Sequence, residues 1–309
     1  MDPSPAFDRI SARELDKSLR QEDAPLLVDT LSDDHFQQVH LPGAQNACVF
    51  QVTFLNRMAE LAPEKGIFIV VYGSRAETRD AETAAGKLMR AGYTRVAVLE
   101  GGLAAWQAAG YPLEGEAPED AVASPTAPVI ERRHYRIDKA NSIIQWVGRN
   151  PNTHHTGRLR LSEGFMDVRA EGIAGRFVID LASIENTSLE GDENQPILIA
   201  HLLSDDFFWA DLFPTAVFSI ERLDPIAGGH LTTPNYTVVG LLEMTGVRAP
   251  LTFPATLAVL PDKRLAAEAH FDFDRTRWNI IYGSSRFFDH LGMHVVFDLI
   301  SVQLKLVSL

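Results

Sequence analysis

A short polar loop between an apolar run and a helical pattern carries residue types that could bind an anion. The apolar run covers residues 67–72 and the helical pattern covers 77–91. The loop between them consists of Gly73, Ser74, Arg75, Ala76, Glu77 and Thr78. Backbone N–H groups of such a loop, together with a helix N-terminus, can cradle an anion. Arg75 and Arg79 are therefore candidates to hold an oxyanion, whereas the Glu77 carboxylate would repel one.

The loop contains no activated nucleophile. Gly73 has no side chain, and the hydroxyl of Ser74 needs a general base, for which no partner is apparent. Cys48 is the single cysteine of the chain, so it forms neither an internal disulfide nor a CxxC metal motif. It follows a Pro-Gly-Ala-Gln-Asn segment, where a small buried residue is the ordinary expectation. We expect Cys48 to be structural.

Histidines are the candidate metal ligands of the second half. The candidates are His154, His155, His201, His270, His290 and His294. The spacings HxH and HExxH are absent, and the adjacent pair His154 and His155 would point to opposite faces of a strand. We predict no metal site. His155 and His201 are instead expected to satisfy buried backbone groups or a ligand head group.

The elements that position the loop alternate between helical and strand patterns over residues 8–115. A capping box begins at Ser11, where Ser-Ala-Arg-Glu starts a helix. The strand patterns lie at 26–29, 67–72 and 96–99, and the helical patterns at 50–61, 77–91 and 103–109. Apolar strands interleaved with helices predict an α/β domain with a parallel sheet flanked by helices.

The pattern changes after a segment rich in proline, alanine and charge. This segment, 116–132, predicts a linker between a first domain at 1–115 and a second at 133–309. In the second domain apolar residues recur at every other position, as in 267–273 and 302–306. Such strands, separated by turn signals, indicate an antiparallel sandwich or barrel. A helical island at 196–208 interrupts them.

Three stretches of the first domain resemble the rhodanese family. They are 27–29 followed by His-Leu-Pro-Gly-Ala-Gln-Asn at 40–46, the strand and loop at 70–78, and 99–106 followed by Ala-Gly-Tyr-Pro. The resemblance implies a cysteine at the first loop position, whose thiolate holds sulfur as a persulfide. Gly73 stands at that position here. We therefore predict a catalytically inactive domain, retained for docking or regulation, and a protein that is not an enzyme.

Residues 133–309 resemble the YceI family. The matching segments lie at 135–148, 155–157, 175–184, 201–218, 239–247 and 273–280, and the most specific is His-Leu-x-Ser-x-Asp-Phe-Phe followed by Phe-Pro-Thr-Ala. The resemblance implies a lipocalin-like antiparallel barrel. It also implies that the barrel holds a long polyisoprenoid chain such as a quinone tail, as in members of the family. Such a barrel of about eight strands is just wide enough for side chains or one slender ligand. An apolar chain gains roughly 0.8 kcal/mol per buried CH₂.

Large apolar residues at alternate positions are the candidates to face the barrel interior: Trp146, Phe165, Phe177, Ile179, Phe207, Phe208, Phe218, Phe253, Trp278 and Phe297. The predicted ligand-binding set is Trp146, Phe177, His201, Phe207, Phe208, Phe218 and Trp278. For each apolar member, core packing is favoured over ligand contact. Neighbours on a helix point about 100° apart, so one of Phe207, Phe208 and Trp209 is expected to be an exposed lid contact. Phe287 and Phe288 either form a rim or lie in a solvated loop.

The overall composition restricts the partners. A net charge of −13 disfavours nucleic acid and anionic membrane surfaces. Neither a signal peptide nor a membrane-spanning run is seen, which predicts a soluble, cytoplasmic protein. No cofactor is expected to be required. The resulting hypothesis is a carrier for an isoprenoid, quinone or fatty acid, with a protein partner for the first domain and a homodimer as further candidates. The alternatives are an interaction scaffold with a filled barrel, and residual sulfurtransferase or redox activity.

Overall fold

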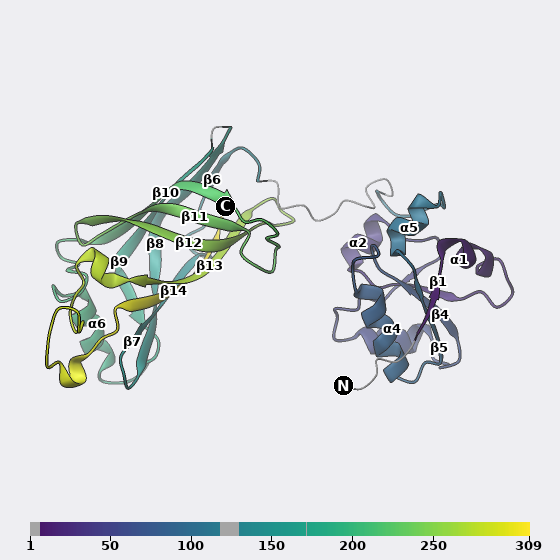
Figure 1. Cartoon of the computed structure of the whole chain (residues 1–309), viewed down its shortest axis with the longest axis horizontal. Helices are drawn as coiled ribbons and strands as arrows, with labels where there is room; N and C mark the ends of the chain where they lie inside the picture. Colours follow the sequence, from purple (N-terminus) through teal and green to yellow (C-terminus); the bar gives the residue numbers. More distant parts are fainter. Residues whose placement is uncertain (1–6, 118–129, 171) are drawn as a thin grey trace. The chain divides into compact units, whose positions relative to one another are not determined.

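The computed structural model describes residues 7–117, 130–170 and 172–309. The chain divides into two compact units, with the boundary between residues 124 and 125 (Figure 1). Each unit is described by itself. Most of the predicted linker, at 118–129, lies outside the described residues. Its described ends belong to the domains: the amides of Glu116 and Ala117 donate to the carbonyls of Gln37 and Gln38, and Ile130 packs against the second core.

The first unit is a five-stranded parallel sheet in the order β1-β5-β4-β2-β3. Its strands are β1 (Asp8–Ile10), β2 (Leu26–Asp29), β3 (Gln45–Asn46), β4 (Phe68–Tyr72) and β5 (Arg95–Leu99). Its helices are α1 (Ala12–Ser18), α2 (Asp33–Gln38), α3 (Phe54–Leu61), α4 (Asp80–Arg90) and α5 (Gly102–Ala108). Because side chains alternate along β4, Ile69 and Val71 pack with α3 and α4, whereas Val70 and Tyr72 pack with α1 and α5. Helices thus cover both faces, as predicted.

Most first-domain elements follow the sequence patterns. Ser11 and Glu14 form the predicted capping box of α1, and the predicted strand at 26–29 is β2. The short helix α2 was not predicted, because its six residues carry only one large apolar side chain, Phe36. The edge strands β1 and β3 were also missed, since runs of two or three residues give no periodic signal.

The second unit is a closed antiparallel barrel of eight strands with one additional short strand. The strands are β6 (His134–Arg136), β7 (Ile143–Arg149), β8 (His154–Arg169), β9 (Gly172–Asn186), β10 (Thr215–Pro225), β11 (Tyr236–Met244), β12 (Val247–Val259), β13 (Leu265–Asp274) and β14 (Leu299–Val307). Their order is β6-β8-β7-β14-β13-β12-β11-β10-β9, and a further pairing of β8 with β9 closes the barrel. This is the predicted lipocalin-like architecture.

The two ends of the barrel differ in the length of their connections. At one end lie the long β9–β10 connection at 187–214, with helix α6 (Gln195–Leu203), and the β13–β14 connection at 275–298, with the 3-10 helices η2 (Arg275–Trp278) and η3 (Gly292–His294). We call this the mouth end. The C-terminus and β6 lie at the other, closed end (Figure 1). Helix α6 is the predicted helical island, but it stops at Leu203, where Ser204 caps it.

Candidate functional site

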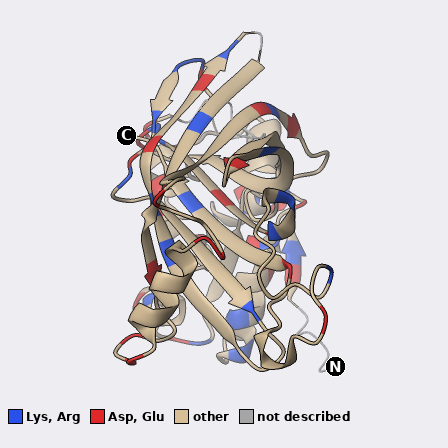
Figure 2. Cartoon of the chain, turned by 90° about the vertical axis from the view of Figure 1, so that its left-hand side faces the viewer, with Lys and Arg blue, Asp and Glu red and all other residues tan. Residues whose placement is uncertain are grey.

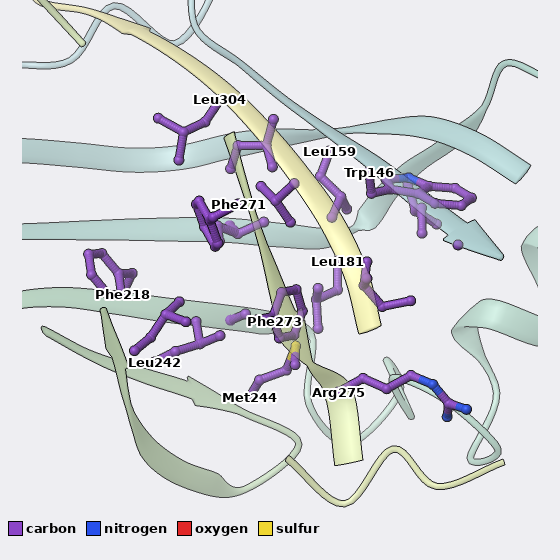
Figure 3. Close-up of a pocket in the computed structure, with 18 of the residues that line it drawn as sticks. Trp146, Leu159, Leu181, Phe218, Leu242, Met244, Phe271, Phe273, Arg275 and Leu304 are labelled. Atoms are coloured by element: carbon purple, nitrogen blue, oxygen red, sulfur yellow. The ribbon is translucent and has the colours of Figure 1, made fainter. Parts of the chain in front are cut away.

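A cavity of about 430 Å³ occupies the interior of the barrel. Its wall consists of the inward faces of the barrel strands, together with side chains of α6 and of the 275–298 connection. Side chains of β13 alternate between the cavity and the outside of the barrel. Leu265, Ala267, Phe271 and Phe273 line the cavity, whereas Ala266, Glu268, His270 and Asp272 do not. Figure 3 shows side chains of several strands pointing into this space.

The cavity wall is almost entirely hydrocarbon. Phe271 stacks on Phe253 with ring centroids 4.1 Å apart, and Phe218 lies 5.5 Å from Phe253. Among the lining residues there is no aspartate and no glutamate. The polar lining residues belong to strand ends and connections at the mouth end: Arg149, Asn150, His155, His201, Arg275, Tyr282 and His294. The interior therefore suits an apolar chain, and any polar group of a ligand would find its partners only near the mouth.

The cavity opens at the mouth end and is closed at the other. Met293 lines the cavity and is nevertheless 77 % exposed, so the space reaches solvent beside η3. At the closed end the lining residues Ile137, Met166 and Leu265 are all buried. The opening through which a ligand could enter therefore lies beside η3.

Helix α6 is held over the mouth by aromatic contacts. The ring of His201 meets Tyr282 edge-on at 4.7 Å and Phe207 at 5.0 Å, and Phe207 lies 5.3 Å from Tyr282. The Nε2 atom of His201 is 3.0 Å from the Asp206 carboxylate. These contacts join the β9–β10 connection to the β13–β14 connection across the opening.

A buried arginine organises the 275–298 connection. The guanidinium of Arg275 donates hydrogen bonds to the carbonyls of Ile280 and Tyr282, each at 2.7 Å, and to those of Val296 and Phe297, each at 3.1 Å. Its burial lowers its pKa, which the Asp298 carboxylate at 3.8 Å opposes. Because its donors are already bonded to the protein, Arg275 shapes the mouth rather than offering a free cation. Sequence reasoning missed it, although it lies in the matching segment 273–280.

His155 stands at the rim of the cavity beside the β7–β8 connection. Its burial, and then the neighbouring His154, lower the pKa of its imidazole. The Nδ1 atom is 3.4 Å from the hydroxyl of Ser188. At neutral pH a neutral imidazole can donate to or accept from a ligand head group, and that role for His155 stays a prediction.

Six of the seven predicted ligand-binding residues line the cavity: Trp146, Phe177, His201, Phe207, Phe208 and Phe218. Trp278 does not, so its predicted place was wrong. It lies in η2 rather than on a strand, is fully buried, and donates from Nε1 to the Leu242 carbonyl at 2.8 Å. Its ring meets Phe273 at 5.5 Å and supports the wall from behind.

The other interior candidates divide in the same way. Ile179 and Phe253 line the cavity, but Phe165 lies outside it and stacks on His134, and Phe297 is exposed. Among the three adjacent aromatics, Phe207 and Phe208 both face the cavity, and Trp209 is the exposed one. That pattern agrees with the expected exposed lid contact. Ligand binding by these residues stays a prediction.

The polar loop of the first domain is folded against α5. The carbonyls of Gly73 and Ser74 accept from the amides of Leu103 and Ala104 at 2.9 and 3.0 Å. Gly102 must be a glycine for this approach, since a Cβ there would lie 2.4 Å from the Gly73 oxygen. Ser74 is next to the Thr78 hydroxyl, at 3.3 Å, which is no general base.

The loop arginine Arg75, and Arg79 just after the loop, pair with nearby carboxylates. Arg75 lies 3.6 Å from Glu77, and Arg79 lies 3.6 Å from Glu82 and is largely exposed. The predicted binding of an oxyanion by the arginines is not tested by these contacts.

Asp80 occupies the space above Gly73. A Cβ built on Gly73 would lie 2.6 Å from Asp80 Oδ2 and 3.1 Å from Asp80 Cβ. A side chain at the first loop position would therefore meet this carboxylate. Cys48, the chain's one thiol, is buried after β3.

A second carboxyl, Asp29, is fully buried at the end of β2. Burial raises its pKa to about 6, although the amide of Leu31 and the hydroxyl of Tyr72 oppose this shift. The carboxyl is thus easily protonated inside the fold. Sequence reasoning did not single it out.

Within the described residues, no cluster of three or more histidine, cysteine, aspartate or glutamate side chains could hold a metal ion. In the same part of the chain, no helix has the length and apolar composition needed to cross a membrane. The candidate site is accordingly the barrel cavity.

The fold and the cavity define a closed antiparallel barrel with an apolar interior, preceded by an α/β domain. A family model described as YceI-like domain matches residues 135–308, and one described as Rhodanese-like domain matches 11–109. Because the first covers more than half of the chain, this protein belongs to the YceI-like family, and it carries a rhodanese-like domain at its N-terminal side. Both predicted resemblances are confirmed.

Solved structures resemble each half. BcnA of Burkholderia cenocepacia is 21 % identical with a TM-score of 0.43, covering 56 % of this chain and 99 % of BcnA. A polyisoprenoid binding domain of Saccharophagus degradans, implicated in plant cell wall breakdown, is 16 % identical with a TM-score of 0.42, covering 56 % and 97 %. The rhodanese-like domain of the Anabaena protein Alr3790 is 30 % identical with a TM-score of 0.32, covering 39 % and 86 %. No curated protein matches the chain.

Proposed function

We propose that the protein is a non-catalytic carrier that holds a long apolar chain, such as an isoprenoid, a quinone tail or a fatty acid, inside the barrel. The observation that carries this proposal is the cavity of about 430 Å³, whose wall is hydrocarbon over its depth and polar only at the mouth. Burial of each CH₂ in such a space contributes about 0.8 kcal/mol. Membership of the YceI-like family supports the same ligand class, because the family resemblance implies a barrel that holds polyisoprenoid chains.

The polar groups near the mouth favour a ligand whose head carries hydrogen-bond acceptors. His155 and His201 stand beside the opening. Also near the mouth, three residues before the end of β7, the Nε1 atom of Trp146 is buried without a hydrogen-bond partner among the described residues. A buried donor left unpaired costs about 1–3 kcal/mol, which a carbonyl or carboxylate oxygen of the ligand would offset. This supports a quinone or a fatty acid over a plain hydrocarbon.

The test is an organic extraction of the purified full-length protein, followed by mass spectrometry. The Ala267→Trp substitution places a large ring inside the cavity, because Ala267 lines it. Ala266→Trp is the matched control, since Ala266 is the neighbour on the outward face of β13. We expect a stoichiometric apolar chain from the wild type and from Ala266→Trp, and a strongly reduced amount from Ala267→Trp. Equal amounts in all three, or an empty wild type after incubation with quinones and fatty acids, would overturn the proposal.

We assign the rhodanese-like domain a non-catalytic role in docking or regulation. Gly73 stands where the family resemblance places the nucleophile, Asp80 crowds that position, and Cys48 is buried after β3. Exposed Phe50 and Val52, in the segment before α3, offer an apolar contact surface for a partner. A thiosulfate:cyanide sulfurtransferase assay should stay at background in the wild type. Activity that disappears in Cys48→Ser would contradict this assignment.

A further inference from the structure

The exposed apolar side chains of the barrel domain gather at the mouth end. Among its described residues, ten large apolar side chains are exposed, and eight of them lie on the β9–β10 connection, the β13–β14 connection or the first residue of β14. The six that we call the mouth rim are Ile197, Trp209, Leu212, Phe287, Phe288 and Met293. Exposed apolar clusters of this kind mark interaction surfaces rather than ordinary solvated surface.

The mouth rim lies on the two connections at the end where the cavity meets solvent. Met293 belongs to both, because it lines the cavity and is exposed. Ile197 lies on α6, whose Leu198 and His201 line the cavity. A chain leaving the cavity therefore passes directly from the hydrocarbon wall to the hydrocarbon rim.

Trp209 is kept at the rim against a backbone cost. Its φ angle is 46°, in the left-handed region that favours glycine. Even so, the position carries a bulky indole that is 48 % exposed. Indole rings combine an apolar body with one polar N–H, which suits the interface between water and a bilayer.

The charge around the rim is acidic. The β9–β10 connection contains six carboxylates and neither lysine nor arginine: Glu190, Asp192, Glu193, Asp205, Asp206 and Asp211. All six are exposed. In Figure 2, helix α6 carries no charge and acidic segments lie in the loops beside it. The β13–β14 connection adds three arginines: Arg275 is buried, Arg286 is paired with Asp274 at 2.7 Å, and Arg277 is exposed and donates to the Pro250 carbonyl. The two connections together carry eight carboxylates and three arginines, so acidic groups prevail.

This charge pattern selects among the surfaces that could cover the rim. An anionic bilayer would be repelled by the carboxylates. A second copy placed rim to rim would bring the same carboxylates together, which disfavours a symmetric pairing. A bilayer of neutral phospholipids accepts apolar side chains without this repulsion, and it is also where water-insoluble chains reside.

We propose that the mouth rim docks onto the surface of a neutral lipid bilayer, so that the apolar ligand passes between the membrane and the cavity without crossing water. The purpose of this docking rests on the proposed carrier function. The choice of a neutral bilayer as the partner rests on the exposed rim and the acidic loops.

The test is flotation of the full-length protein with lipid vesicles. We expect association with phosphatidylcholine vesicles, and weaker association when phosphatidylglycerol is added. The double variant Phe287→Ser/Phe288→Ser should bind at least about tenfold more weakly, since two aromatic side chains lose their burial. Leu231→Ser is the control, because Leu231 is an exposed apolar residue at the closed end.

Tryptophan fluorescence gives an independent reading of the same event. Trp209 is the exposed one of the four tryptophans, as the other three are buried. Vesicles should shift its emission to shorter wavelength, and Trp209→Phe should remove that shift. No association with either vesicle, equal binding of the double variant, or stronger binding to phosphatidylglycerol would overturn the proposal. The proposal would also be overturned if the wild type formed a dimer in solution and did not bind vesicles, and if the double variant were a monomer.

Ligand content, measured on the same preparations, separates this proposal from the carrier function. Ala267→Trp should lose its bound chain and still float with vesicles. The double rim variant, loaded with a quinone from detergent solution, should hold the chain and fail to float.

Discussion

At the scale of single residues, the closeness of the Asp80 side chain to Gly73 disfavours a side chain at the first loop position. We predict that Gly73→Ala lowers the free energy of unfolding of the first domain by about 1–3 kcal/mol, because the new Cβ overpacks against Asp80. Gly66→Ala is the control, since a Cβ there meets open space. Hydrogen exchange of peptides covering 68–99 measures the loss.

Asp80→Ala provides the second half of this test. In the Gly73→Ala background it should restore part of the lost stability, because it removes the oxygen 2.6 Å from the added Cβ. Strictly additive effects of the two substitutions would show that the two positions do not interact.

Asp29 gives the first domain a distinct dependence on pH. Its pKa is about 6 in the fold and about 3.9 in an unfolded chain, so the folded state holds the proton more tightly. The stability from this group is complete below about pH 4 and is lost as the pH rises through about 6, a change of about 3 kcal/mol. We predict that Asp29→Asn, which keeps the acceptor for Leu31, removes this decline.

The measurement is hydrogen exchange of the first domain at several pH values between 4 and 7.5. The advantage of Asp29→Asn over the wild type should grow through this range and level off above about pH 7. Asp23→Asn, which removes an exposed carboxylate, is the control. An advantage that does not vary with pH would contradict the assignment.

At the scale of elements, the 275–298 connection depends on one buried guanidinium. Removing it in Arg275→Met leaves four carbonyls without their donor. We predict a loss of about 3–5 kcal/mol in the stability of the barrel, as for other buried charges whose network is broken. Arg277→Met is the matched control, because Arg277 is exposed and donates to one carbonyl. Denaturant unfolding measures both, and equal effects would refute the role of Arg275.

The elements also show how far sequence patterns reach. Alternation along strands correctly placed Trp146, Phe177 and Phe218 in the wall of the cavity. It failed for Trp278, because a 3-10 helix has no two-residue period. The contact between Gly73 and Asp80 and the bonds of Arg275 were out of reach, since they depend on how loops fold back in space. The sequence predicted only part of the exposed rim, because for Phe287 and Phe288 it left open whether they form a rim or lie in a solvated loop.

At the scale of the whole molecule, an occupied cavity links ligand binding to the stability of the barrel. A ligand that binds only the folded state, present at a hundredfold excess over its Kd, stabilises by about 2.7 kcal/mol. We predict that removing the bound chain lowers the unfolding midpoint of the barrel and that adding it back restores it. Ala267→Trp should show no such difference. Calorimetry of stripped and reloaded protein is the measurement, and identical curves for the wild type would contradict the prediction.

The two chain ends of the barrel meet at its closed end. The amide of Leu309 donates to the carbonyl of Arg136 at 2.8 Å, and Ile137 forms a bridge with Ser308. A short peptide could therefore join them, and the turn at Gly228 and Gly229, at the same end, could be cut instead. Such a circular permutant would keep every strand pairing and leave the mouth untouched, so the order of the strands along the chain is separable from the container that they build.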